Sequence, residues 1–289
     1  PDQPILRDPT IIHGADFVIT ESTYGDRLHQ LYDKETALIE IVNETMDRGG
    51  NLIIPSFAVG RTQTLLYYFF RLHREGRLDP DIPIIIDSPL AINATRVFLK
   101  NFRDFDEDAL KVFGKNGKVP DFPQVRLCET AAESRALNTS EGSAIIISAS
   151  GMADAGRVLH HLKHNLWRAN SAVVFVGFQS PGTLGRRLLD GVEKVKLFGE
   201  EIAVKAKIVN FQGLSSHADH DHLVQWIKAF DPKPTHVFVV HGDEDVAPVF
   251  AEELNSLGFH AHAAKFTECY DLAANEMVSE GYISERKRT

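Results

Sequence analysis

The sequence has few cysteines and no long apolar run. Its two cysteines, Cys128 and Cys269, lie far apart and form no CxxC pair, which argues against a disulfide framework and a cysteine metal site. We expect both to be buried free thiols. No stretch approaches the roughly 20 apolar residues that cross a bilayer, and residues 1–9 lack the basic-then-apolar pattern of a signal peptide. These absences predict a cytoplasmic protein with no membrane association.

Basic residues are fewer than acidic residues. The 289 residues contain 31 Lys and Arg against 40 Asp and Glu, a formal net charge of −9. This balance argues against a protein that coats nucleic acid, which needs clustered cations to displace counterions, but it leaves local processing of RNA open. The chain begins at Pro1 without an initiator Met, so we expect it to be part of a longer gene product. Its size and composition predict one large globular α/β domain or two smaller ones.

Short β-branched runs alternate with helical patterns along the first two-thirds of the chain. Continuous apolar runs of this kind are typical of strands buried on both faces of a sheet. Residues 38–46 follow helical spacing, and Gly49-Gly50 stops that helix. The alternation predicts a Rossmann-like parallel sheet with helical crossovers. The expected strands are 17–19, 52–54, 84–86, 145–147 and 173–176, and further helices are expected from 56 to 77, from 88 to about 102 and from 151 to 166.

The pattern changes near Gly182, where we expect a second region to begin. Residues 195–204 alternate around a Gly-containing turn, which predicts a β-hairpin. Residues 101–123 are polar with spaced Phe and are expected to form a lid or a surface excursion. The other expected elements are a strand at 208–209, a helix at 219–230, a strand at 237–240, a helix after Pro248 and a last strand near Phe266.

Two expected strands lead directly into short polar motifs. Strand 17–19 runs into TESTYGD (20–26), and strand 237–240 runs into HGDE (241–244). Residues at the carboxyl ends of strands line the ligand crevice of α/β sheets. Glu21 is therefore a candidate catalytic carboxylate, and His241 is a candidate for zinc ligation or proton transfer. The alternatives are that Glu21 only caps a loop and that His241 is an ordinary buried histidine.

A third motif, SSHADHDH (215–222), contains three His and two Asp within six residues. A helix that starts in this motif points His220 and His222 in different directions around its axis, so the three histidines cannot share one ion. We expect His217 to be functional, because it lies at the start of the helix. The alternative for the rest is capping by Ser216 and Asp219, with the other two histidines solvated.

Two loops resemble phosphate-binding turns, SASGM (148–152), which is followed by Arg157, and FAVGR (57–61). Backbone N–H groups at a helix N-terminus bind anions, but neither loop has the Walker or GxGxxG spacing, so a nucleotide site is not predicted. The basic stretches 185–187 and 160–164 are more consistent with solvated helix surface than with phosphate contacts. The candidate RNA- or phosphate-binding residues are Ser148, Ser150, Gly151, Met152, Arg61 and Ser88.

These motifs occur in a family-specific order over about residues 15–266. The order is TESTYGD, PSFAVGRTQ, DSPLA, ESRALN, SASGM, GFQSPGTLG, SSHAD and VVHGDED. In this combination the chain resembles the β-CASP family of RNA-processing nucleases. The resemblance implies a β-CASP domain inserted into a metallo-β-lactamase αββα sandwich. It predicts the end of an N-terminal metallo-β-lactamase part at 1–30, the β-CASP domain at 31–182 and a C-terminal metallo-β-lactamase part at 183–289.

The resemblance also implies roles for three residues. Glu21 corresponds to the acidic motif A, His217 to motif B and His241 to motif C. In the family, the motif C histidine is a zinc ligand. The motif B histidine, held by the motif A carboxylate, protonates the leaving oxygen when a phosphodiester bond of RNA is hydrolysed. The implied cofactor is two zinc ions, and the implied substrate is single-stranded RNA.

One family motif is absent. The HxHxDH run, a later single His and a bridging Asp belong before motif A, but no HxHxDH occurs in the 289 residues. Of the expected zinc ligands only His241 is present, and one imidazole cannot hold a dinuclear site. We therefore expect this chain alone to be inactive and the missing metallo-β-lactamase segment to be supplied elsewhere.

Two other functions stay open. The chain is alternatively a non-catalytic RNA-binding or assembly module, although the presence of all three motif residues argues against this. A metallo-hydrolase of small esters is the other alternative, which the β-CASP-like insertion disfavours. The sequence leaves open endonuclease against exonuclease action, RNA sequence preference, cleavage of DNA and whether the protein is a homodimer.

Overall fold

The computed structural model describes residues 3–29, 33–116, 122, 124–140, 142–211 and 213–283. The chain divides into two compact units. Unit 1 contains Pro1, residues 9–29 and residues 217–289, and unit 2 contains residues 2–8 and 30–216. Most of unit 2 is thus one continuous segment that leaves unit 1 after His29 and returns to it at His217. No helix in the described part of the chain is long and apolar enough to cross a membrane.

Unit 2 is built on a six-stranded sheet in which every neighbouring pair is parallel. The strand order is β4-β3-β5-β2-β6-β9, and β7 and β8 form a separate antiparallel hairpin. The central strands are buried on both faces, as their continuous apolar runs predict. The strands are β2 (Leu52–Pro55), β3 (Ile84–Ile86), β4 (Val125–Leu127), β5 (Ile145–Ser148), β6 (Ala172–Phe175), β7 (Lys194–Leu197), β8 (Glu200–Ala203) and β9 (Lys207–Asn210).

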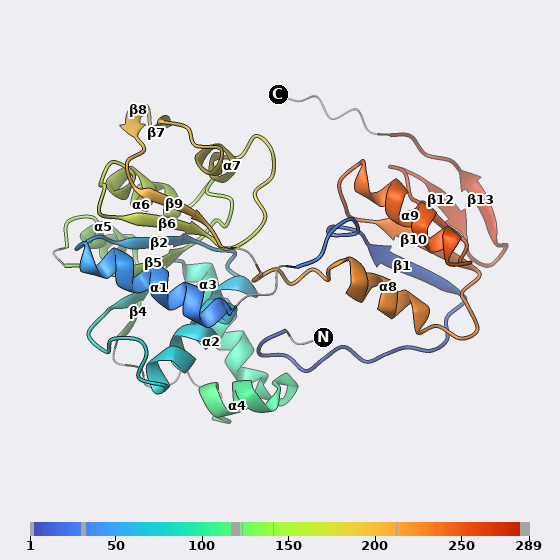
Figure 1. Ribbon diagram of the computed structural model, residues 1–289, viewed down its shortest axis with the longest axis horizontal. Helices are drawn as coiled ribbons and strands as arrows, with labels where there is room; N and C mark the ends of the chain where they lie inside the picture. The colour runs from blue at the N-terminus through green and yellow to red at the C-terminus, as the bar shows by residue number, and fades with distance from the viewer. Residues whose placement is uncertain are drawn as a thin grey trace. The chain divides into compact units, whose positions relative to one another are not determined.

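Helices cover both faces of this sheet (Figure 1). One apolar cluster joins the first four helices to alternate strand residues such as Ile54 and Val174, and a second joins α6, α7 and the β7–β8 hairpin to the opposite face through Ile53 and Val173. The period-2 alternation of the strands therefore gives unit 2 two cores. The helices are α1 (Lys34–Asp47), α2 (Arg61–Arg74), α3 (Pro89–Lys100), η1 (Phe102–Asp104), α4 (Glu107–Phe113), α5 (Ala131–Leu137), α6 (Val158–Asn165) and α7 (Leu184–Leu189).

Unit 1 contains a smaller parallel sheet in the order β1-β10-β11. Helices α8 and α9 pack on one face of it, where Val18, Val237 and Val239 are buried. An antiparallel β12–β13 hairpin follows near the C-terminus. The elements are β1 (Phe17–Glu21), α8 (His220–Lys228), β10 (His236–Val240), α9 (Val246–Ser256), β11 (Ala261–Ala263), β12 (Cys269–Asp271) and β13 (Glu276–Ser279).

The predicted α/β class with a Rossmann-like parallel sheet is confirmed. The five strands expected from apolar runs are all present, as are the hairpin at 195–204 and the helix at 38–46. The strand at 17–19, expected in the same sheet as 52–54, instead belongs to the smaller sheet of unit 1, where β1 pairs with β10. Part of the segment 101–123 forms η1 and α4; residues 117–121 and 123 of this segment lie outside the described residues.

Three further expectations were wrong. The last strand of the parallel sheet is β11 rather than a strand at Phe266, which makes only an isolated bridge with Tyr282. The helix expected from residue 151 begins at Val158, because turns occupy the preceding residues. Cys128 is buried as expected, but Cys269 is exposed, because it lies on the solvated β12–β13 hairpin.

Candidate active site

The carboxyl ends of β1 and β10 place two candidate residues side by side. The parallel register pairs Glu21 with Val240, so Glu21 and His241 emerge at the same edge of the sheet. The backbone N–H of Ser22 donates to the His241 carbonyl at 3.1 Å. Gly242 makes the close approach of the strand ends feasible, because a Cβ there would lie 2.2 Å from Ser22 Oγ. The local fold therefore fixes the spacing of the two motifs.

His217 reaches the same edge from the loop before α8. Its Nδ1 lies 2.6 Å from Glu21 Oε2, and its backbone carbonyl accepts a hydrogen bond from His29 Nε2 at 2.9 Å. Asp219 caps α8 by accepting the N–H of His222, and the same carboxylate accepts the N–H of His29. The backbone at His217 and at the start of α8 is thus anchored within unit 1, and the side chain is directed at the Glu21 carboxylate.

His241 completes the group. Its Nδ1 lies 3.9 Å from Glu21 Oε2, and the rings of His217 and His241 stack with centroids 5.2 Å apart. The Thr23 hydroxyl lies between the two rings, 3.4 Å from Nδ1 of His217 and 3.1 Å from Nδ1 of His241. Thr23 was not singled out from the sequence, although it lies within the TESTYGD motif.

The three side chains offer donors of the kind that zinc prefers. One oxygen of Glu21 and one nitrogen from each of His217 and His241 lie within 4.8 Å of one another. Within the described residues this is the one group of three His, Cys, Asp or Glu side chains with such convergence. Imidazole nitrogen and carboxylate oxygen fit Zn²⁺ chemically, but a dinuclear centre needs more donors than these three.

The other two histidines of the SSHADHDH motif lie outside this group, as predicted. His220 contacts Glu253 Oε2 at 2.8 Å and Asp221 Oδ1 at 2.9 Å. Its hydrogen bond with Glu253 raises the pKa of His220 above the usual value. His222 Nδ1 lies 2.7 Å from Asp219 Oδ1. The expectation of solvated side chains was wrong, because each ring pairs with a carboxylate, and Asp219 rather than Ser216 is the helix cap.

Comparison with known proteins identifies the family. Residues 62–188 match the Beta-Casp domain, and residues 201–264 match the Zn-dependent metallo-hydrolase RNA specificity domain. The chain belongs to the β-CASP family of metallo-β-lactamase-fold proteins. Ribonuclease TTHA0252 of Thermus thermophilus is 36% identical over 270 residues, which cover 92% of this chain and 61% of that protein.

Two archaeal relatives from Methanocaldococcus jannaschii extend the comparison. An RNase J-like protein is 35% identical over 250 residues, or 86% of this chain and 56% of the relative. Transcription termination factor FttA is 28% identical over 249 residues, or 83% of this chain and 39% of the relative. The β-CASP chain described here therefore spans less than two-thirds of the length of each of these relatives.

In unit 2 of this β-CASP protein, several candidate phosphate-binding side chains are used within the fold. Ser148 is buried and donates to the Asp87 carbonyl at 2.8 Å. Ser88 is buried and caps α3 by accepting the N–H of Ala91. Ser150 Oγ accepts the N–H of Asp154 at 3.2 Å. The loop at 148–152 does not lead directly into a helix, since α6 begins at Val158, whereas Arg61 does begin α2.

Asp87 forms a buried carboxylate–histidine group in unit 2 that the sequence did not predict. Asp87 follows β3 and is fully buried; its carboxylate accepts from Arg157 at 2.7 Å and lies 2.6 Å from His161 Nε2. Ser134 donates to it as well, at 2.5 Å. Burial raises the pKa of Asp87, but the hydrogen bonds from His161, Ser134 and Arg157 outweigh burial, and the net effect lowers the pKa. The interpretation of 160–164 as solvated surface was wrong for His161.

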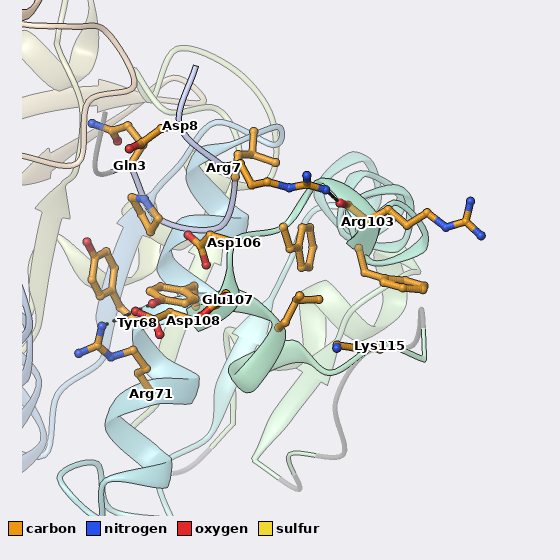
Figure 2. A pocket seen from close by; sticks show the side chains of 16 residues that line it. Gln3, Arg7, Asp8, Tyr68, Arg71, Arg103, Asp106, Glu107, Asp108 and Lys115 are labelled. Carbon is orange, nitrogen blue, oxygen red and sulfur yellow. Dashed lines mark hydrogen bonds between the residues drawn. The ribbon is translucent and has the colours of Figure 1, made fainter. Parts of the chain in front are cut away.

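A hollow of about 940 Å³ lies between the N-terminal segment and helices α2 and α4 of unit 2. Figure 2 shows Asp106, Glu107 and Asp108, from the start of α4, on the same wall as Tyr68 and Arg71 of α2. None of its lining residues belongs to the candidate site or to the candidate phosphate-binding set. Its walls carry charges of both signs and do not define a ligand class.

Proposed function

We propose that this chain supplies the general acid and the β-CASP domain of a zinc-dependent ribonuclease that cleaves phosphodiester bonds of single-stranded RNA. The observation that carries the proposal is the 2.6 Å contact between Glu21 and His217 beside His241. The family match and the relatives named ribonuclease support RNA as the substrate class.

In this proposal Glu21 orients the imidazole ring of His217. Glu21 accepts a hydrogen bond from Nδ1 of His217, and Nε2 is the nitrogen that we propose exchanges a proton. The carboxylate orients the ring, and in this proposal His217 delivers a proton to the leaving oxygen as the general acid. His241, whose side chain is 67% exposed, is available as a zinc ligand. Bound zinc would activate water and stabilise negative charge on the phosphate.

A complete centre needs donors from beyond this set. No HxHxDH run is present in the 289 residues. We propose that a metallo-β-lactamase segment outside these 289 residues supplies the remaining ligands for two zinc ions and that this chain by itself does not cleave RNA. In unit 2, RNA phosphates are proposed to contact the loop of Ser148, Ser150, Gly151 and Met152, with Arg61 and Ser88. Because the Ser148 and Ser88 hydroxyls are engaged in the fold, backbone groups carry these contacts.

The test compares this chain with the full-length product of its gene. Zinc content is measured by elemental analysis, and cleavage is followed with a labelled single-stranded RNA. We expect only the longer protein to bind about two zinc ions per molecule, as a dinuclear hydrolase requires, and to cut RNA. His241→Ala in the longer protein should lower zinc content, whereas His222→Ala, a matched histidine outside the centre, should not.

The outcomes separate the alternatives. Zinc binding and cleavage by the longer protein alone support the proposal. Full retention of zinc in His241→Ala would remove the ligand role of His241. Absence of both zinc and cleavage from both proteins would favour a non-catalytic RNA-binding module, and zinc with hydrolysis of small esters but not RNA would favour a small-molecule metallo-hydrolase.

A further inference from the structure

Exposed apolar side chains gather at one edge of the unit 2 sheet. Strands β5, β2 and β6 are parallel neighbours, so the loops after them emerge at the same edge. The loop after β2 carries Phe57, which is 44% exposed, and the loop after β6 carries Phe178, which is 39% exposed. Val59 and, after the adjacent β3, Leu90 are exposed as well. Single exposed apolar residues are ordinary, but a row along one edge indicates a binding surface.

Phe57 is held in place without burial of its ring. Its backbone carbonyl accepts hydrogen bonds from the Thr62 N–H at 3.2 Å, the Thr62 hydroxyl at 2.8 Å and the Ser56 hydroxyl at 3.3 Å. The ring lies against Gly151, where a Cβ would come within 2.9 Å of ring atom Cδ2, and a Cβ at Gly177 would lie 3.9 Å from ring atom Cε2. The two glycines thus let three loops approach one rigid, exposed aromatic ring.

Gln179 fixes the neighbouring loop. Its side-chain amide is buried and donates to the carbonyls of Gly151, Gly177 and Phe178 at distances of 3.0, 3.0 and 3.1 Å. These bonds join the loop after β5 to the loop after β6. The backbone that carries Phe178 is therefore fixed by hydrogen bonds. Phe57 and Phe178 would lose little conformational entropy on binding a ligand.

Positive charge in this part of unit 2 comes from two residues at helix starts. Arg61 begins α2 directly after the Phe57 loop, and Lys34 begins α1. Burial lowers the pKa of Lys34, and the nearby positive charge of Arg61 lowers it further. Positive charge beside exposed aromatic rings attracts a polyanion. This arrangement suits a polyanionic backbone whose bases reach the aromatic rings.

We propose that Phe57 and Phe178 form a stacking platform for unpaired RNA bases, with Lys34 and Arg61 attracting the phosphates. This inference rests on the proposed function as an RNA nuclease. It identifies the side chains that would contact the RNA bases. Aromatic rings on a positively charged track are a common solution for single-stranded nucleic acid, because every base has a π-face and sequence is not read. The predicted preference is for single strands over duplexes, whose bases are already stacked.

The experiment removes either the aromatic ring of Phe57 or the bases of the RNA. Binding of a fluorescent single-stranded oligouridylate, and of the same strand with abasic sites, is measured for the full-length protein and its variants. Phe57→Ala should weaken binding of the intact strand by about 5- to 100-fold, and Phe57→Leu, which keeps apolar volume but not the ring, should do nearly the same. Phe57→Tyr should bind as the unmodified protein does. Trp167→Ala is the matched control, because Trp167 is exposed and precedes β6, at the opposite edge.

Abasic RNA distinguishes stacking from other losses. If Phe57 stacks a base, abasic RNA binds the unmodified protein weakly, and Phe57→Ala no longer distinguishes the two strands. Equal weakening of both strands by Phe57→Ala, or no weakening of either, would overturn the platform, the latter in favour of a contact surface for another protein segment. Continued zinc-dependent cleavage of RNA in that case leaves the proposed function intact, whereas absence of RNA binding and cleavage by the unmodified protein rejects both.

Discussion

Two of the carboxylate–imidazole pairs of this protein, one in each unit, have the same contact distance and opposite surroundings. Glu21–His217 and Asp87–His161 each have an oxygen–nitrogen distance of 2.6 Å. Asp87 and His161 have side chains 0% and 1% exposed, and Arg157 and Ser134 occupy the remaining positions around the carboxylate. Glu21 and His217 are 25% and 38% exposed. Protein groups supply the hydrogen-bond partners of the buried carboxylate, whereas the exposed pair stays accessible to a substrate.

The largest difference between the pairs should be in catalysis. In the full-length protein, His217→Ala should reduce RNA cleavage by about 100- to 10,000-fold, because a general acid contributes that much. Zinc content should stay near normal, and stability should change by no more than about 0.5 kcal/mol, as for other surface substitutions. Single-turnover cleavage of labelled RNA, with zinc analysis of the same sample, provides the measurement. An unchanged rate would remove His217 from the mechanism.

The buried pair should dominate stability. Asp87→Ala leaves Arg157 and His161 without their carboxylate in the interior and should lower the free energy of unfolding by about 3–5 kcal/mol. The matched control is Asp81→Ala, which removes an exposed carboxylate before the same strand, β3. Urea unfolding gives the comparison. A loss for Asp87→Ala no larger than that of the control would show that the cluster contributes little to the fold.

Acid should destabilise the two units over different pH ranges. Burial and the charges of neighbouring His260 and His262 lower the pKa of His236 in unit 1 to about 4 from 6.5. The unfolded chain therefore binds a proton first, and unit 1 loses stability as the pH falls from about 6.5 to 4. The lowered pKa of Asp87 stabilises unit 2 above the usual carboxyl pKa of about 4, and this contribution is lost as the pH falls further.

The two tryptophans separate these effects, since Trp226 lies in unit 1 and Trp167 in unit 2. Proteins that retain one Trp each should show the first acid loss at Trp226 and the later one at Trp167. His236→Gln should flatten the first response, and Asp87→Asn the second. Coincident transitions in both single-Trp proteins would contradict this order.

Glu21→Gln is expected to have only a small effect on stability. The pair with His217 is partly solvated, so its loss should change the free energy of unfolding by less than about 1 kcal/mol, in contrast to Asp87. Cleavage by the full-length protein should fall all the same, because the carboxylate that contacts Nδ1 and orients the His217 ring is lost. A stability loss comparable to that of Asp87→Ala would mean that the two pairs contribute equally to the stability of the fold.

The sequence predicted the strands and the three motif residues because each depends on local patterns. Continuous apolar runs indicate buried strands, and a polar residue directly after such a strand lies at the ligand edge of the sheet, as Glu21 and His241 do. His217 was predicted from its place before a helix. The family resemblance is confirmed by the domain matches, whereas the roles of these residues remain predictions.

Burial was harder to predict. Asp87 also follows a strand directly, as Glu21 does, and only the long-range contacts with Arg157 and His161 show that it is enclosed. His161 lies in a stretch rich in His and Lys, and its helix turns that one ring toward the sheet. Cys269 was expected to be buried because of its residue type alone, but it is exposed because it lies on the solvated β12–β13 hairpin.

The hydrogen bond between His29 and the His217 carbonyl also explains how the chain accommodates a large insertion. Residues 30–216 depart from unit 1 after one of these residues and return at the other, and the two lie within 2.9 Å through side chain and backbone. An insertion whose ends meet in this way leaves the β1-β10-β11 sheet uninterrupted in space, although its strands are far apart in sequence. The inserted domain can therefore change in length and surface over evolution while the spacing of Glu21, His217 and His241 is preserved.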